Sequence, residues 1–186
     1  MSERLADLLN LELAWHRTKF DIPDRVFVTN PYLIELVEQD LPTYLASIRE
    51  QIIRGYTPAP SGTCQEPKGK WQVRPGALLR LSDDVLFNAL IGESFPYITR
   101  KLRWSQEDPD IAYQLENVST AVAWVRRGFL IWQEWRQKSL EKLTTAEFVL
   151  MADIAAFYEN IDLPRLSSDL RSVGMDDEAT DRKSVV

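Results

Sequence analysis

The sequence contains few of the residues that build covalent or metal-centred sites. Its single cysteine, Cys64, excludes an internal disulfide and any zinc site that needs several cysteines. Its single histidine, His16, excludes the HExxH type of zinc site and any site that combines a histidine triad with a histidine-bound metal. No apolar run approaches the roughly 20 residues that a helix needs to span a bilayer. The N-terminus lacks the basic and then apolar layout of a secretion signal, so we expect a cytoplasmic protein without a membrane partner.

The composition of the chain is typical of a globular protein. Its 186 residues are 45% hydrophobic and 27% charged, which fits one domain or a piece of a larger one. The formal net charge of -6 is unevenly distributed. Between Arg49 and Arg80 there are six basic and two acidic residues, whereas between Asp153 and Asp181 there are eight acidic and two basic ones. Such a pattern fits a polyphosphate site beside a metal site. It also fits two solvated faces that differ in charge, which is the commoner case.

Hydrophobic spacing predicts helices in the first part of the chain. We expect one helix over Ser2–Thr18 and a second that opens near Pro42 and ends at Gly55. The buried stripe of the second helix is expected to consist of Leu41, Leu45, Ile48 and Ile52. Frequent proline and glycine predict that residues 56–75 form a loop, with short strand pieces around Trp71–Val73.

The rest of the chain predicts two further helices and one strand. Ser82 is expected to cap a helix, and apolar residues at helical spacing predict a long helix over Asn117–Leu143. The apolar run Phe148–Ala152 favours a buried strand that ends at Asp153. The expected fold class is therefore α+β, mostly helical with a small sheet. We expect three regions, which are residues 1–55, 56–147 and 148–186.

The segment from Phe148 to Leu170, FVLMADIAAFYENIDLPRLSSDL, carries the clearest chemical pattern. A buried strand that ends at Asp153 would hold this carboxylate rigidly, where a hard cation such as Mg²⁺ can bind it. Tyr158 follows five residues later, close enough to contact whatever the metal binds. A single aspartate after a strand is more often a helix cap or a surface carboxylate, so the surrounding residues decide the interpretation.

Two segments resemble motifs of one enzyme family, and they occur in that family's order. Asp153–Asp162 (DIAAFYENID) resembles the first catalytic-aspartate motif of reverse transcriptases, most of all the bacterial group II intron, retron and phage-defence types. Upstream, Pro67–Gly76 (PKGKWQVRPG) and Leu81–Asp84 (LSDD) resemble the fingers motif of the same family. Tyr56-Thr57-Pro58 is similar to the Y-x-P sequence that precedes this motif.

The resemblance implies two-metal nucleotidyl transfer by part of an RNA-directed DNA polymerase. In the family, the aspartate that matches Asp153 bridges two Mg²⁺ or Mn²⁺ ions, and the backbone carbonyl that matches Ile154 binds one of them. The implied partners are an RNA template, a DNA primer and a dNTP. The implied fold is the fingers and the first palm segment of a right-hand polymerase, with residues 56–147 resembling the fingers and residues 148–186 the start of the palm.

The resemblance also implies a nucleotide site. The lysine and arginine that match Lys68 and Arg74 contact the triphosphate of the incoming dNTP, for which an ammonium and a guanidinium are suited. Lys70 is an alternative to Lys68, because the register of this loop is open. The aromatic residue that matches Tyr158 lies beneath the sugar and excludes a 2′-hydroxyl, a role that is compatible with simple packing.

One part of the family's metal site has no match in the chain. The family has an aromatic-x-D-D hairpin several tens of residues beyond the first aspartate. We do not assign Gly174–Asp177 to it, because this segment is too close to Asp153, has a glycine in place of the aromatic residue and lacks apolar flanking strands. We expect an acidic loop after a helix there, and we expect Asp162 to cap that helix or to pair with Arg165.

One carboxylate is too few for two divalent ions, so we expect no polymerase activity from this chain alone. The charged, patternless last residues suggest a truncated or frame-shifted product, or one part of a split enzyme that a separate C-terminal polymerase half completes. The alternative hypothesis is a non-enzymatic helical module that binds nucleic acid or protein, in which Asp153 is structural.

Overall fold

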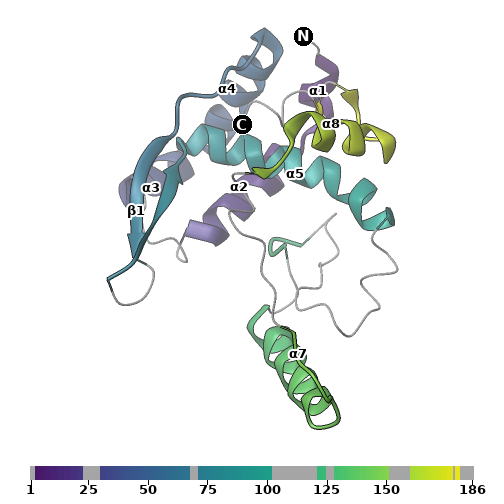
Figure 1. Cartoon of the computed structure of the whole chain (residues 1–186). Helices are drawn as coiled ribbons and strands as arrows, with labels where there is room; N and C mark the ends of the chain where they lie inside the picture. Colours follow the sequence, from purple (N-terminus) through teal and green to yellow (C-terminus); the bar gives the residue numbers. More distant parts are fainter. Residues whose placement is uncertain are drawn as a thin grey trace. The chain divides into compact units, whose positions relative to one another are not determined.

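The structure is a computed structural model that describes residues 3–22, 30–67, 71–101, 121–124, 128–150, 160–177 and 179–180. Its helices are α1 (Glu3–Leu8), α2 (Leu11–Asp21), α3 (Pro31–Gln39), α4 (Leu41–Arg54), α5 (Leu81–Lys101), α7 (Gly128–Leu143) and α8 (Leu163–Ser172), and its strands are β1 (Gly62–Pro67) and β2 (Val73–Leu78) (Figure 1). The expected fold class, mostly helical with a small sheet, is confirmed. None of the described helices combines the length and the apolar character needed to cross a membrane.

The chain divides into two compact units, and the division falls inside α5 between Glu93 and Ser94. The first unit contains α1 to α4, the two strands and most of α5. The second unit contains the end of α5 with α7 and α8. The three regions expected from the sequence are bounded by sequence motifs, whereas the two units are defined by their compactness. The division into three regions stays a prediction.

The single helix expected over Ser2–Thr18 is interrupted. The described residues form α1 and α2, with a break at Leu9 and Asn10. The Asn10 side chain accepts a hydrogen bond of 2.9 Å from the backbone N–H of Leu13, and this cap begins a new helix. The apolar spacing continues across the break, and for this reason the sequence predicts one helix.

Helix α4 agrees closely with its prediction. Pro42 lies in its first turn, where a missing N–H costs nothing, and Asp40 caps it by accepting from Thr43 N at 3.3 Å. Gly55 ends the helix with a φ of 105°, a left-handed conformation that glycine adopts without strain. Ile48 and Ile52 of the expected stripe are buried.

The core of the first unit is formed by apolar residues of α1, α2, α4 and α5. Its most buried members are Leu5, Ala6, Ala14, Trp15, Ile48, Ile52, Val85 and Leu90. Trp15 meets the ring of Tyr44 edge-on at 5.8 Å, and its indole N–H donates to Glu38 Oε1 at 2.6 Å. This bond is the main reason why the pKa of Glu38 is lowered. Trp15 therefore links α2 with both α3 and α4.

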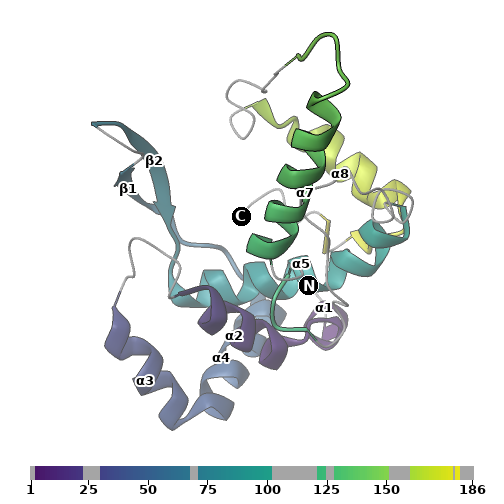
Figure 2. The same cartoon turned by 90° about the horizontal axis from the view of Figure 1, so that it is seen from below.

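The two strands form an antiparallel hairpin in which Gly62 pairs with Leu78 and Pro67 with Val73. Figure 2 shows the hairpin extending away from α2, α3 and α4 of the same unit. The expected loop over residues 56–75 is thus wrong for 62–67 and 74–75, whereas Val73 lies in a strand as expected. In a two-stranded sheet every strand is an edge strand, and edge strands tolerate proline. The prolines therefore did not exclude a hairpin here.

Helix α5 begins at Leu81, one residue before the Ser82 that was expected to cap it. The carbonyl of Arg80 accepts from Asp84 N at 2.9 Å, so Ser82 already lies in the first turn. Asp83 and Asp84 lie in the first turn, as expected from the favourable interaction of carboxylates with the positive end of a helix dipole.

In the second unit, α7 begins at Gly128. Of the earlier part of the helix expected over Asn117–Leu143, residues 121–124 are not helical and bend instead, and residues 117–120 and 125–127 lie outside the described residues. Trp124 packs against Phe95 with ring centroids 5.2 Å apart, and this contact accompanies the non-helical backbone. Valine and threonine near the expected start also have low helix propensity, so local preference does not oppose the bend.

Candidate functional site

Of the residues predicted to bind the nucleotide or the metal, only Arg74 lies in the described part of the chain. The others, Lys68, Asp153, Ile154 and Tyr158, lie outside the described residues, and so does the alternative Lys70. The structure therefore describes only one part of the predicted site, the hairpin that carries Arg74.

Arg74 is the second residue of β2 and lies directly opposite Glu66 of β1. Its Nε donates to Glu66 Oε2 at 2.6 Å, while 61% of the Arg74 side chain stays exposed. Because this ion pair uses Nε, the two terminal nitrogens of the guanidinium are not engaged by it. These nitrogens are the ones that bind an anion end-on. The ion pair with Glu66 thus orients the Arg74 guanidinium through Nε, while most of the side chain stays exposed to solvent.

Gly76 gives Glu66 and Cys64 the room that this arrangement needs. Gly76 lies opposite Cys64 in the hairpin register. A Cβ added at Gly76 would lie 2.8 Å from Cys64 Sγ, which is closer than such atoms pack, and 3.2 Å from Glu66 Cγ, which is a tight contact. Because Gly76 has no side chain, the Glu66 carboxylate that orients Arg74 has room to lie across β2.

The base of the hairpin is closed by a buried polar contact. Tyr56 precedes β1, and its hydroxyl donates to Asp83 Oδ1 at 2.5 Å, just after β2 has led into α5. The same hydroxyl lies 3.2 Å from Ser82 Oγ. Asp83 is 1% exposed, and among the described residues its Oδ2 has no hydrogen-bond partner. The lead-in tyrosine and the first of the two aspartates of the motif thus meet in the folded protein.

Burial, reinforced by the hydrogen bond to Asp83, raises the pKa of Tyr56 to about 12. The hydroxyl is therefore protonated at neutral pH and remains a donor to the carboxylate. Burial likewise raises the pKa of the nearby Tyr44 to about 12, with the charges of Tyr56, Asp83 and Asp84 acting in the same direction.

A cavity of about 390 Å³ opens beside this contact, between α3, α4 and the start of α5. It is lined by Leu33, Tyr44, Ser47, Ile48, Gln51, Arg80, Leu81 and Ser82. The sequence did not reveal it, because its lining comes from segments that are separated by the whole hairpin. Its volume lies within the range of small-molecule sites, but no cluster of reactive groups faces it.

The buried strand expected over Phe148–Ala152 is wrong for its described residues. Phe148, Val149 and Leu150 form no strand, and they are 84%, 59% and 91% exposed. A strand is stable only where a neighbouring strand pairs with it, and the only sheet among the described residues is the β1–β2 hairpin. Apolar character alone therefore did not produce a strand here.

Asp162 caps α8, as expected. Its Oδ1 accepts from Arg165 N at 3.0 Å, and the Arg165 side chain instead approaches Asp169 at 3.9 Å. Asp162 is therefore committed to the helix end rather than to a metal.

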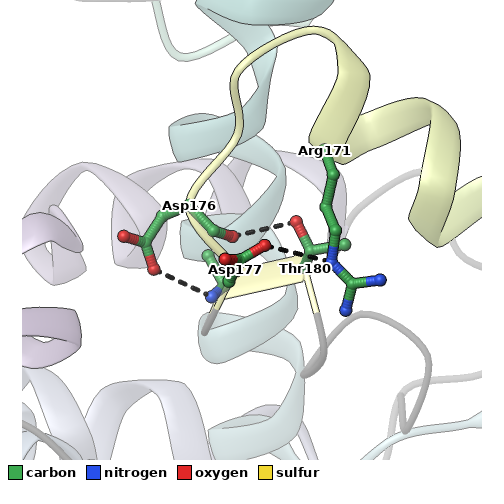
Figure 3. Close-up of polar contacts among 5 residues, drawn as sticks. Arg171, Asp176, Asp177 and Thr180 are labelled. Carbon is green, nitrogen blue, oxygen red and sulfur yellow. Dashed lines mark hydrogen bonds and ion pairs between the residues drawn. The ribbon is translucent and has the colours of Figure 1, made fainter.

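The expected acidic loop after a helix is found at Gly174–Asp176, whereas Asp177 is already helical. Gly174 ends α8 at a φ of 92°, and Met175 N donates to Leu170 O, as in a glycine-terminated helix. Figure 3 shows how the two aspartates are used: Asp177 pairs with Arg171 at 3.1 Å, and Asp176 accepts from Ala179 N at 3.4 Å. Both carboxylates stabilise the local chain.

No group of three or more histidine, cysteine or acidic side chains in the described residues could hold a metal ion. A carboxylate and a carbonyl at Asp153 and Ile154 have the oxygen chemistry that Mg²⁺ prefers, but Asp162, Asp176 and Asp177 are used elsewhere. The described residues therefore do not complete a two-metal site.

Comparisons with protein-family models, with curated proteins and with solved structures found no match to this chain. The functional assignment accordingly depends on the residues themselves.

Proposed function

We propose that the chain is the N-terminal part of a cytoplasmic RNA-directed DNA polymerase of the reverse transcriptase family, comprising the fingers and the first palm segment. It binds an RNA template with a DNA primer, and it contacts the dNTP triphosphate through Arg74 together with Lys68 or Lys70. Two-metal nucleotidyl transfer at Asp153 and Ile154, with Tyr158 beneath the sugar, requires a C-terminal palm, so the chain is inactive alone.

The observation that carries this proposal is the contact between Tyr56 and Asp83. Tyr56 belongs to the Y-x-P lead-in and Asp83 to the Leu81–Asp84 part of the fingers-like segment, and the two residues lie 27 positions apart in the sequence. Their hydrogen bond makes the segment one folded element. The exposed guanidinium of Arg74 on that element supports a role in binding phosphate.

Primer extension tests the proposal. The chain is co-expressed with the polypeptide encoded downstream of it, and dNTP incorporation on an RNA template is measured with Mg²⁺ or Mn²⁺. We expect incorporation only when both parts are present, and we expect Asp153→Asn to abolish it because the metals lose their shared ligand. Asp162→Asn is the matched control: asparagine also caps helices, so activity should be retained.

The alternative, a non-enzymatic helical module that binds nucleic acid or protein, is favoured by one observation. Phe148–Leu150 does not form the strand that should lead into Asp153. Under this alternative, Asp153→Asn affects stability alone, and no added polypeptide restores nucleotide incorporation.

A further inference from the structure

Trp71 occupies an unusual position in the hairpin. It lies in the connection between β1 and β2, two residues before Val73, and its side chain is 102% exposed, although tryptophan is mostly buried in proteins. Its backbone φ of 63° is left-handed, a conformation that is unfavourable for any residue with a side chain. Neither property stabilises the first unit, so a binding role is the natural explanation.

The charge around Trp71 indicates what it binds. Residues 62–78 contain the basic Lys68, Lys70 and Arg74 and the acidic Glu66, which gives a net charge of +2 in a chain whose total is -6. An exposed aromatic ring within a basic stretch of sequence is the combination typical of single-stranded nucleic-acid binding, in which the ring stacks on a base while cations neutralise phosphates. An acidic protein surface would be attracted by the charges but would not use the flat face of the ring.

We propose that Trp71 stacks on an unpaired base of single-stranded nucleic acid and that, while no dNTP is bound, Arg74 contacts the adjacent backbone phosphate. A paired base has both faces covered by its neighbours, so the proposal is specific to single strands. The inference rests on the proposed function, to which it adds a residue that holds the template strand. It concerns binding alone and involves no metal or second polypeptide.

The test measures the fluorescence anisotropy of labelled 12-nucleotide oligo(U) and oligo(dT) with the full chain. Trp71→Leu keeps an apolar side chain but removes the π-face, and we expect binding to weaken about ten-fold. Trp71→Phe should retain binding within about three-fold, since a smaller ring still stacks. The slope of log K against log salt should stay unchanged in Trp71→Leu and become shallower in Arg74→Ala, because only the arginine displaces counterions.

Tyr32→Leu is the matched control, because Tyr32 is also an exposed aromatic residue (74%) but lies on α3. It should bind both oligomers like the wild type. Equal binding by Trp71→Leu and the wild type would overturn the inference, and so would an equal loss in Tyr32→Leu. Failure of the wild type to bind either oligomer at low salt would also overturn it and would redirect attention to a protein partner.

The outcome is separable from that of the proposed function. A completed enzyme that extends primers while Trp71→Leu binds the oligomers normally would overturn only the role of Trp71. Stacking by a chain that supports no primer extension would instead leave Trp71 as part of a nucleic-acid-binding module.

Discussion

Tyr56 and Asp83 are joined by a buried hydrogen bond of 2.5 Å between the phenol and the carboxylate, and this bond closes the base of the β1–β2 hairpin. The other oxygen of Asp83 has no partner among the described residues, so Tyr56 is the donor on which this buried carboxylate depends. A buried carboxylate without a donor is costly. The stability of the element that carries Arg74 should therefore depend on a single hydroxyl.

We predict that Tyr56→Phe lowers the free energy of unfolding by about 1–3 kcal/mol, because Asp83 loses its donor while the ring stays in place. Urea denaturation followed by circular dichroism measures the change. Tyr32→Phe removes a hydroxyl from an exposed ring and should change little. Equal stability of the two variants would contradict the importance of the Tyr56–Asp83 bond.

The same tyrosine makes stability dependent on alkaline pH. The pKa of Tyr56 is about 12 in the folded chain, against an ordinary value of 10.0. The unfolded state therefore loses its proton first, and the contribution is present below pH 10 and is lost as the pH rises towards 12. We expect the free energy of unfolding to fall over this range, and to fall less steeply in Tyr56→Phe. Parallel profiles for both proteins between pH 9 and 12 would argue against the raised pKa.

Gly76→Ala should disturb the hairpin, because the new methyl group would lie 2.8 Å from Cys64 Sγ and press on Glu66. We expect faster amide hydrogen exchange in β1 and β2, with a loss of about 1–3 kcal/mol that Cys64→Ala partly restores. Gly62→Ala is the control in the same hairpin, since its Cβ would meet Leu78 at an ordinary 3.5 Å. If both alanines slow or accelerate exchange equally, the close contact at Gly76 is not decisive.

Arg74→Ala should weaken binding of a dNTP about ten-fold or more, since a charge-assisted hydrogen bond contributes about 1.5–3 kcal/mol. Calorimetric titration of the chain completed by its C-terminal half measures this affinity. Arg54→Ala is the matched control, because Arg54 is also an exposed arginine paired with a glutamate, Glu50, but lies on α4. An equal effect of the two substitutions would mean that Arg74 contributes only general charge.

The sequence predicted best where a local signal and the burial pattern agree. The predicted bounds and buried face of α4 agree closely with the structure, because Pro42 and Gly55 mark its ends and Ile48 and Ile52 mark its buried stripe. Asp162 was likewise assigned to a helix end, since a cap depends only on its immediate neighbours. Such features need no knowledge of distant contacts.

The sequence failed where distant contacts decide. The hairpin depends on pairing between residues such as Glu66 and Arg74, which proline and glycine content does not reveal. Phe148–Leu150 shows the opposite error, in which an apolar run forms no strand because no described strand pairs with it. The contact between Tyr56 and Asp83 was missed for the same reason, although both residues belong to the motif that the sequence singled out.

The nucleotide sequence downstream of the Val186 codon, translated in all three forward frames, tests the central claim most directly. The proposed function predicts an aromatic-x-D-D segment between two apolar strands within a domain's length, which would supply the carboxylates that Asp153 lacks. The absence of such a segment in every frame would contradict the assignment to a reverse transcriptase and would leave a chain that binds without catalysis.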